Sequence, residues 1–284
     1  MDMTELRGRI DAADEALINA FVERMNVSGE IAQYKAAHGL PVLDKKRERE
    51  KLYAVSGKVP EDMPVERAAL LDPLAVAVRT VELAQRCPGT MENCLDETRT
   101  ALVIGDGTIG ALVAYYLRLL GIGRLVIAGG REKRLKKCTS LAQADLLLNY
   151  KTQSLEERSE LIGQLTGGRG ADVVFQCVGT GRAFMDGLHL MKRIGTLIEC
   201  GNAMKPSPVE FDPFVDLCAK HATLIGMTVN TPQAFNKAFT VLEDHGKGLE
   251  SVFTHACGLE ELAETMGKSS QSDYMKGIVY PNRK

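Results

Sequence analysis

Positively charged side chains recur in the N-terminal part of the sequence at spacings that could bind a small anion. Arg24 and Lys35 are eleven residues apart, close to three helical turns, so on one helix they share a face. Arg7 lies near the start of the same predicted helix, and Arg47 and Glu48 fall in the first turn of a second one. Arginine grips carboxylates bidentately, so convergence of these cations suits a substrate with more than one carboxylate. Each residue taken alone would more simply be a solvated surface charge.

A glycine-rich stretch further along the chain has a spacing that could bind phosphate. Residues 101–110 read ALVIGDGTIG, an apolar strand-like run with glycines at G-x-G-x-x-G spacing, and a helix-like apolar run follows. Gly105 would allow the tight turn, Gly107 the approach of a pyrophosphate, and Gly110 close packing of the helix on the strand. The helix N-terminus would offer free N–H groups to the phosphates. The order strand, turn, helix favours a dinucleotide site over a merely structural turn; its predicted residues are Gly105, Gly107, Thr108, Ile109 and Gly110.

The end of the second predicted strand bears on the choice of cofactor. An NAD site usually has an acidic residue there that binds the ribose 2′-hydroxyl. Here Gly129 stands at that position, and the nearby Arg131 could pair with a 2′-phosphate, for which the small Gly130 would leave room. The sequence therefore predicts NADP rather than NAD. The alternative is that Arg131 merely begins a surface helix.

Composition and charge limit the class of protein to which this chain can belong. The 284 residues are 45% hydrophobic and 25% charged, with a net charge of -2, so bulk charge does not argue for a nucleic-acid partner. There is no secretory signal pattern and no apolar run long enough to span a bilayer, so we expect no membrane partner. Seven dispersed cysteines without a C-x-x-C pair predict reduced thiols and a cytoplasmic location.

Two kinds of segment must position these residues. Residues 4–38 predict one helix roughly 50 Å long, whose single apolar stripe needs partner helices, including those of a second subunit in a homodimer. Asp44 is then the expected N-cap of a second helix over 45–56. Beyond residue 98, strand-like and helix-like runs alternate, which predicts an α/β fold with a doubly wound parallel sheet of the Rossmann type. The predicted strands are 101–104, 124–128, 145–149, 172–177, 195–200 and 222–226; the predicted helices are 110–120, 132–141, 155–166, 184–191 and 211–220.

Residues 1–63 resemble the all-α chorismate mutase family. The resemblance rests on the runs LRxxIDxxD from Leu6, ERM from Glu23, IAxYK from Ile31, GLPVxD from Gly39 and RExExL from Arg47. It implies a helical hairpin that rearranges chorismate to prephenate without a cofactor. By this resemblance Arg7, Arg24 and Arg47 serve the substrate carboxylates and the transition state, with Arg7 coming from the partner subunit. Lys35 donates to the ether oxygen, while Asp44 and Glu48 position the substrate hydroxyl.

The third helix of that family corresponds to a predicted helix over residues 65–86. Its Gln85 falls near the place of a family glutamine that reaches the ether oxygen. The family serine one turn earlier is missing, with Thr80 or Val81 near its place, and Pro73 in the interior is expected to bend the helix. The sequence leaves open whether residues 64–98 complete the mutase pocket or form a linking helix of the domain that follows.

Residues 64–284 resemble the nucleotide-binding half of medium-chain, zinc-type alcohol dehydrogenases. Besides the glycine turn, the resemblance rests on ERAALLDPLAVAVRT from Glu66, NYK from Asn149, GADVVFxCVG from Gly170 and GTLxxxG from Gly195. It implies an NAD(P)-binding domain over residues 99–284. The cofactor's nicotinamide half would lie near Val178, Gly179, Gly201 and Asn202.

The zinc-binding catalytic domain of that family has no counterpart in this sequence. No cysteine precedes Cys87, and the only upstream histidine is His38, so three protein ligands for a catalytic zinc cannot be assembled there. The other histidines show no metal-ligand spacing, and no zinc is expected.

Three functions remain open at this point. The leading one is a chorismate mutase, acting on chorismate or another small dicarboxylate in aromatic amino acid synthesis, fused to an NADP-binding domain. The second is a zinc-independent NADP-dependent oxidoreductase with a degenerate mutase segment. The third is a non-catalytic NADP-binding protein.

Overall fold

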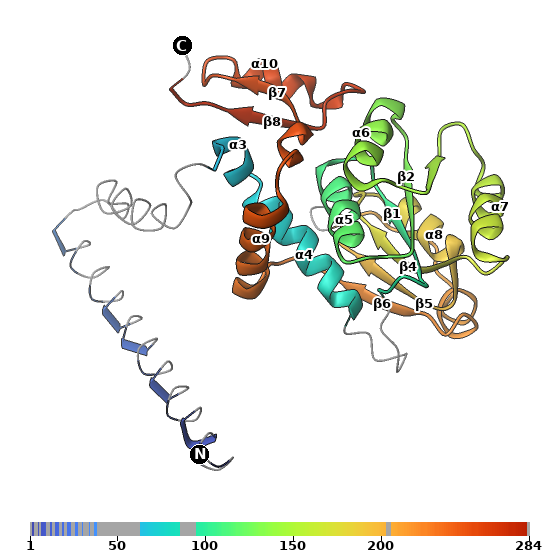
Figure 1. The fold of residues 1–284 in the computed structure, drawn as a ribbon, viewed down its shortest axis with the longest axis horizontal. Coiled ribbons are helices and arrows are strands. Elements are labelled where there is room, and N and C mark those ends of the chain that lie inside the picture. Colours follow the sequence, from blue (N-terminus) through green and yellow to red (C-terminus); the bar gives the residue numbers. More distant parts are fainter. Residues whose placement is uncertain are drawn as a thin grey trace. The chain divides into compact units, whose positions relative to one another are not determined.

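A computed structural model describes residues 63–85, 95–202 and 206–282, together with scattered positions between Asp2 and His38. The chain separates into two units, Met1–Glu61 and Asp62–Lys284. In the first unit every described position from Glu5 to Ala37 is helical and exposed, as the predicted long helix requires (Figure 1). The apolar residues that predicted its buried stripe, and the predicted second helix, lie outside the described residues.

A six-stranded parallel sheet forms the centre of the second unit. Its strand order is β3-β2-β1-β4-β5-β6, so the chain begins in the middle and winds outward to each edge. This is the doubly wound order that the alternating sequence pattern predicts, and the Rossmann fold is confirmed. The strands are β1 (Thr100–Ile104), β2 (Arg124–Gly129), β3 (Leu146–Asn149), β4 (Ala171–Gln176), β5 (Met191–Glu199) and β6 (Thr223–Gly226).

Helices cover both faces of the sheet, which is why its central strands are apolar throughout. On one face lie α4 (Leu71–Gln85), α5 (Thr108–Leu119), α6 (Glu132–Ala142) and α9 (Pro232–His245). On the other lie α7 (Leu155–Thr166) and α8 (Gly181–Leu190) (Figure 1). All five residues of β1 are buried, and within the strand Val103 packs toward the first face while Leu102 packs toward the second.

Most predicted boundaries differ from the observed ones by one to four residues, and the helix α9 was not predicted from the sequence. β5 begins at Met191 rather than at 195, because Met191 already pairs with Ala171 of β4 across a register shift. The predicted helix over 211–220 is shorter, a π-helical turn η1 (Pro213–Cys218). It begins where the Asp212 carboxylate accepts hydrogen bonds from the backbone N–H groups of Phe214 and Val215.

The predicted helix over residues 65–86 is divided into α3 (Val65–Ala68) and α4. The expectation that Pro73 bends the interior of one helix is wrong, because Pro73 lies in the first turn of α4. A proline is tolerated there, since the first N–H groups of a helix have no intrahelical acceptor. The buried side of α4 includes Leu74, Val78 and Val81, each 0% exposed, and it packs against α5 and α9.

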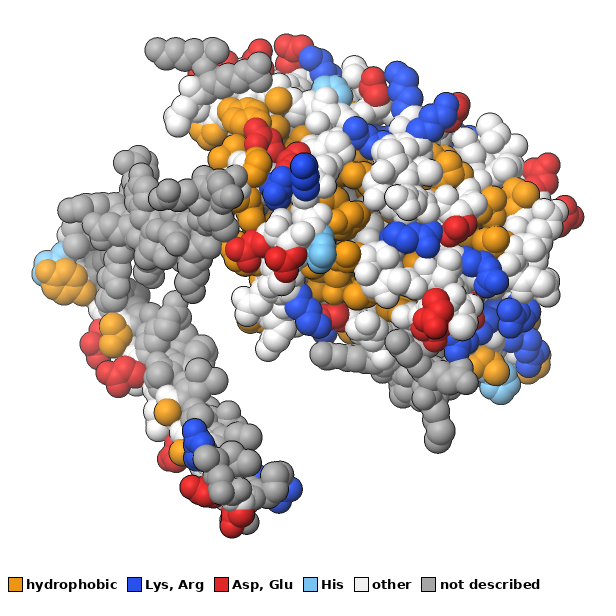
Figure 2. Space-filling view, viewed as in Figure 1, with side chains coloured by type: hydrophobic (Ala, Val, Ile, Leu, Met, Phe, Trp, Pro, Cys, Tyr) orange, Lys and Arg blue, Asp and Glu red, His pale blue; other side chains and the backbone are white. Residues whose placement is uncertain are grey.

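The C-terminal part adds a small parallel pair of strands. After α9 come η2 (Leu249–Val252), β7 (Phe253–Cys257), α10 (Leu262–Gly267), η3 (Lys268–Ser270) and β8 (Lys276–Val279), with β7 beside β8. None of the helices in the described parts of the chain is long and apolar enough to cross a membrane. Over the visible face of the α/β unit, basic side chains are interspersed with acidic ones rather than gathered into one patch (Figure 2).

Candidate functional site

The glycine-rich turn joins β1 to α5 with the geometry that its spacing predicts. Gly105 has a φ of +137°, which favours glycine, and a Cβ there would lie 3.2 Å from Cβ of Cys177. A Cβ on Gly110 would lie 2.0 Å from the carbonyl oxygen of Gly105, so the helix packs directly on the turn. Gly107, the N-cap of α5, has open space where its Cβ would be. An anion can therefore approach the first N–H groups of α5, which have no partner within the helix.

Thr108 and Ile109, the first two residues of α5, are held by different contacts. Thr108 donates a hydrogen bond from its hydroxyl to the carbonyl oxygen of Met275, which ties the start of α5 to the C-terminal part of the chain. Ile109 packs against the hydrophobic core on the α5 side of the sheet. Both predicted residues thus help to fix the position of the helix N-terminus.

Asp106, the residue between the first two glycines, explains the glycines at the end of β2. Its carboxylate oxygen Oδ2 accepts hydrogen bonds from the N–H groups of Gly130 at 2.9 Å and Arg131 at 2.7 Å. A Cβ on Gly129 would lie 2.6 Å from the Cβ of Asp106. A Cβ on Gly130 would lie 2.3 Å from the ring of Tyr150, so this contact needs the small residue, and room for a phosphate there stays a prediction.

A cavity of about 290 Å³ opens where β1, β2 and β4 end. Residues of the turn, of the β2 terminus and of the segment after β4 line it, as does Tyr150 after β3. Ligands of open parallel sheets bind at this edge, beside the point where the strand order reverses. Four of the predicted residues, Gly105, Gly129, Arg131 and Val178, are brought together around this cavity.

Three arginine side chains line this cavity, and two of them, Arg158 and Arg182, were not predicted from the sequence. Arg158 of α7 is almost fully buried and pairs with Asp186 of α8, with Nη2 and Oδ2 2.9 Å apart. Arg131 lies 4.0 Å from Asp106. Arg182 of α8 is exposed and forms no ion pair with any residue that the structure describes. Arg131 and Arg158 are thus balanced by carboxylates, and Arg182 adds one uncompensated positive charge.

The remaining predicted cofactor residues lie where β4 and β5 end. The carboxylate of Glu199 accepts hydrogen bonds from the N–H groups of Gly201 and Asn202 at 2.9 and 2.8 Å. A Cβ on Gly179 would contact the carbonyl oxygen of Gly201 at 3.3 Å. Val178 donates its N–H to the side-chain oxygen of Gln176 at 2.6 Å. Burial raises the pKa of the Glu199 carboxyl, although these hydrogen bonds oppose the shift.

The residues assigned by resemblance to the mutase pocket are only partly described. Arg7 lies on the exposed N-terminal helix, and Gln85 is exposed at the end of α4. Arg24, Lys35, Asp44, Arg47 and Glu48 lie outside the described residues. Thr80 and Val81 are 0% exposed and belong to the interior of the α/β unit, where the Thr80 hydroxyl donates to the carbonyl oxygen of Val76 at 2.7 Å. The buried face of α4 is therefore committed to the α/β unit.

The described parts of the chain contain no group of three or more His, Cys, Asp or Glu side chains that could hold a metal ion.

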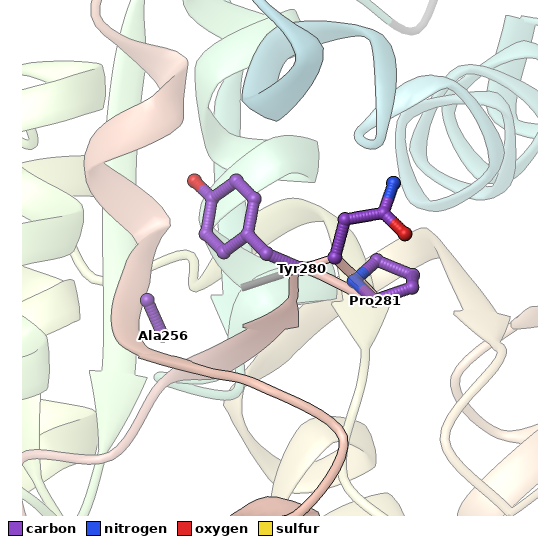
Figure 3. Close-up of a pocket in the computed structure, with 4 residues that line it drawn as sticks. Ala256, Tyr280 and Pro281 are labelled. Carbon is purple, nitrogen blue, oxygen red and sulfur yellow. The ribbon is translucent and has the colours of Figure 1, made fainter. Parts of the chain in front are cut away.

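A second cavity, of about 600 Å³, lies beside the C-terminal strands. Its described lining comprises Ala256 of β7 and Tyr280, Pro281 and Asn282 after β8 (Figure 3). The Tyr280 hydroxyl donates a hydrogen bond to the carboxylate of Glu66. These lining residues offer no cluster of charged groups, so the cleft at the strand ends is the better candidate site.

Two family models match separate parts of the chain. Residues 108–244 match the zinc-binding dehydrogenase family, and residues 6–72 match chorismate mutase type II. The mutase match ends at the beginning of α4, before Thr80 and Gln85.

Curated relatives are dehydrogenases and reductases. D-xylulose reductase A of Aspergillus oryzae is 27% identical over 169 residues, covering 60% of this chain and 44% of that protein. Erythritol/L-threitol dehydrogenase of Mycolicibacterium smegmatis is 28% identical over 211 residues, covering 73% of this chain and 53% of that protein. The chain thus spans about half the length of these relatives.

Solved structures share the fold of the second unit. An alcohol dehydrogenase from Thermotoga maritima superposes with a TM-score of 0.67 at 28% identity, covering 74% of this chain and 55% of that one. A protein named as a zinc-binding dehydrogenase from Sinorhizobium meliloti, bound to NADP, has a TM-score of 0.68 at 20% identity, with 78% and 61% covered. Both resemblances are therefore confirmed as matches: residues 6–72 are similar to chorismate mutase type II, and residues 108–244 are similar to the zinc-binding dehydrogenase family, within a Rossmann fold.

Proposed function

We propose that the α/β unit binds NADP(H) and serves an oxidoreductase of the medium-chain dehydrogenase type. The observation that carries the proposal is Arg131, which lines the cavity beside the glycine turn while Gly129 occupies the place of the acid that selects NAD. The 2′-phosphate of NADP is a dianion, and arginine binds phosphate through charge-assisted hydrogen bonds. When bound, the cofactor would supply hydride transfer, and this chain's residues would bind and orient it.

The charge balance of the cavity supports NADP over NAD. Asp106 is engaged by two backbone N–H groups, so it fixes the backbone at Arg131 instead of offering both carboxylate oxygens to a ribose. Arg182 adds a positive charge without a described partner, on the α8 side of the same cavity. A dianion between Arg131 and Arg182 would be favoured electrostatically, whereas a neutral 2′-hydroxyl would gain little.

A polyol is the substrate class that the names of the relatives support. They act on D-xylulose, sorbitol, erythritol or L-threitol, so a small polyol and its ketose are the first pair to test. The described cysteines are all free thiols, which supports a cytoplasmic location.

Chorismate mutase activity is the second candidate function. The match over residues 6–72 favours it, as do the charged residues Arg7, Arg24, Lys35, Arg47 and Glu48 that the family resemblance assigns to the substrate. In this proposal chorismate is held between the long N-terminal helices of a homodimer. Consumption of chorismate by the purified chain, with and without NADPH, tests it. Turnover no faster than the uncatalysed reaction would remove this candidate.

Cofactor binding is tested by titrating NADPH and NADH against the full chain and following the fluorescence of the reduced nicotinamide. We expect tighter binding of NADPH. Arg131→Ala should weaken NADPH binding about 10- to 100-fold, which corresponds to the 1.5–3 kcal/mol of a charge-assisted hydrogen bond. NADH binding should change little. Arg193→Ala, which removes an exposed arginine of β5 outside the cavity lining, is the matched control. Equal weakening of both cofactors would contradict the 2′-phosphate role.

A further inference from the structure

Two cysteine side chains face each other at the carboxyl ends of neighbouring strands. Cys177 directly follows β4 and Cys200 directly follows β5, and their sulfur atoms are 3.6 Å apart. Both are partly exposed, whereas Cys138 and Cys257 are buried.

The backbone holds the two cysteines in register. Gln176 pairs with Glu199 in the parallel ladder, and the N–H of Cys200 donates to the carbonyl oxygen of Gln176 at 3.0 Å. Neighbouring strands are spaced about 4.7–4.9 Å apart. This spacing lies inside the range of about 4.4–6.8 Å between Cα atoms that disulfides span. The sulfurs need to approach by only about 1.5 Å to reach bonding distance.

The two thiols differ in their hydrogen-bonding roles. In the structure the Cys200 thiol donates to the sulfur of Cys177. When Cys200 ionises, the contact reverses and the Cys177 thiol donates to the thiolate, which lowers the pKa of Cys200 against the effect of burial and raises that of Cys177. The thiolate is the reactive form of cysteine, so Cys200 is the better nucleophile of the two.

We propose that Cys177 and Cys200 form a redox-active dithiol, which a small peroxide oxidises to a disulfide across the ends of β4 and β5. The Cys200 thiol releases its proton and the thiolate attacks one peroxide oxygen; the O–O bond breaks, Cys200 becomes a sulfenic acid, and the departing hydroxide takes up the released proton and leaves as water. The sulfur of Cys177 then attacks the sulfur of Cys200. The S–S bond forms, the S–O bond breaks, and the Cys177 proton leaves with the hydroxide as a second water. The pair loses two electrons in total, and the peroxide gains them.

The position of the dithiol links it to the cofactor cleft, and this part rests on the proposed NADP site. The Cβ of Cys177 adjoins Gly105, the first glycine of the turn, and the N–H of Cys177 donates to the carbonyl oxygen of Ile104 at 2.8 Å. Val178 and Gly201, expected at the nicotinamide half, are the next residues along the chain. A bound cofactor therefore covers the pair and slows its oxidation. By linkage, the disulfide weakens cofactor binding by the same factor.

The experiment treats the full reduced chain with hydrogen peroxide and maps its peptides by mass spectrometry. We expect a Cys177–Cys200 linked peptide with the loss of two hydrogen atoms, restored by dithiothreitol. In Cys177→Ser the reaction should stop at the Cys200 sulfenic acid, which dimedone captures. In Cys200→Ser no adduct should form at Cys177. Cys218→Ser, which removes an exposed cysteine of η1, is the matched control and should oxidise as the wild type does.

Several results would overturn the proposal. Peptides of Cys177 and Cys200 that stay reduced while Cys218 is oxidised would show that exposure alone decides reactivity. A dimedone adduct on Cys177 in Cys200→Ser would overturn the assigned order of attack. A disulfide that forms equally fast with saturating NADPH would overturn the link to the cleft. Failure of the reduced chain to bind NADPH would instead remove the proposed function, and the peptide map would still decide the dithiol.

Discussion

The N-terminal segment and the α/β unit hold their charged residues in opposite ways. On the described positions of the N-terminal helix, charged side chains such as Arg7, Glu15 and Glu23 are exposed. In the α/β unit, charges are paired within the fold: Arg158 with Asp186, Lys237 with Glu82, and Lys192 with Asp172. These charges of the first segment thus meet solvent, whereas these pairs in the second segment hold its own elements together.

In the sequence, the helix α4 begins where the N-terminal segment with exposed charges gives way to the α/β unit with paired charges. The mutase match ends at residue 72, and α4 then buries its apolar face against α5 and α9. A helix can present a given face to only one set of neighbours, so Thr80 and Val81 are not available to a mutase pocket. Only its exposed end, with Gln85, could still contribute.

The largest expected effect is on stability, and it tests whether α4 packs into the core of the α/β unit. Leu74→Ala should lower the free energy of unfolding of the α/β unit by about 2–5 kcal/mol, because it leaves a cavity in a fully buried position. Denaturant unfolding followed by circular dichroism measures it. Val65→Ala, at a position 63% exposed in α3, is the control and should change stability by less than about 0.5 kcal/mol. A similar small effect of Leu74→Ala would mean that α4 is not held by the α/β unit.

The next effect separates the two segments by activity. Arg24→Ala should reduce chorismate turnover by about 10²–10³-fold, the usual cost of removing a group that stabilises developing charge. NADPH affinity should stay unchanged, because the cofactor cleft lies wholly within the second unit. Arg9→Ala, on the same helix but outside the predicted pocket, serves as the control. Loss of both functions in Arg24→Ala would show that the comparison between two separate regions is wrong.

A smaller effect concerns the paired charges of the α/β unit. Burial alone would raise the pKa of Asp172, but hydrogen bonds from Lys192 and the Thr100 N–H, with the charges of Lys192 and Arg99, lower it below 3.8. An aspartate with a lowered folded pKa stabilises the fold above its unfolded pKa, and this contribution is lost as pH falls through the folded value. Wild type should therefore exceed Asp172→Asn in unfolding free energy near neutral pH, and the difference should shrink below about pH 4. A difference independent of pH would contradict the ionic role.

The smallest effect concerns Arg182, the cation of the cavity that has no described ion-pair partner. Arg182→Ala should weaken NADPH binding by up to about fivefold, because an exposed ion pair contributes about 0.2–1 kcal/mol. The loss should disappear at high salt, since exposed charges are screened. NADH titrations of the same variant supply the comparison. An effect as large as that of Arg131→Ala would mean that the phosphate lies closer to α8 than to the end of β2.

Local patterns in the sequence were sufficient for much of the fold. The apolar runs and the G-x-G-x-x-G turn predicted all six strands and the doubly wound order, because strand burial and helix packing leave a direct trace in residue type. The boundaries of β5 and η1 were missed. The start of β5 depends on its pairing with Ala171, and the start of η1 depends on the cap at Asp212. Both are contacts in the folded chain that the local residue pattern does not reveal.

In the candidate site, too, some features were predictable from local sequence and others depend on tertiary contacts. The sequence by itself determined the glycine turn and the proximity of Arg131 to the end of β2, since both follow from a short strand–turn–helix motif. Only the tertiary structure decided that Asp106 lies under Gly129, that Tyr150 fills the space beside Gly130, and that Arg182 and the Cys177–Cys200 pair lie at the same edge of the sheet. These residues come from separate strands and helices, and side-chain contacts across a sheet have no signature in the spacing of one segment.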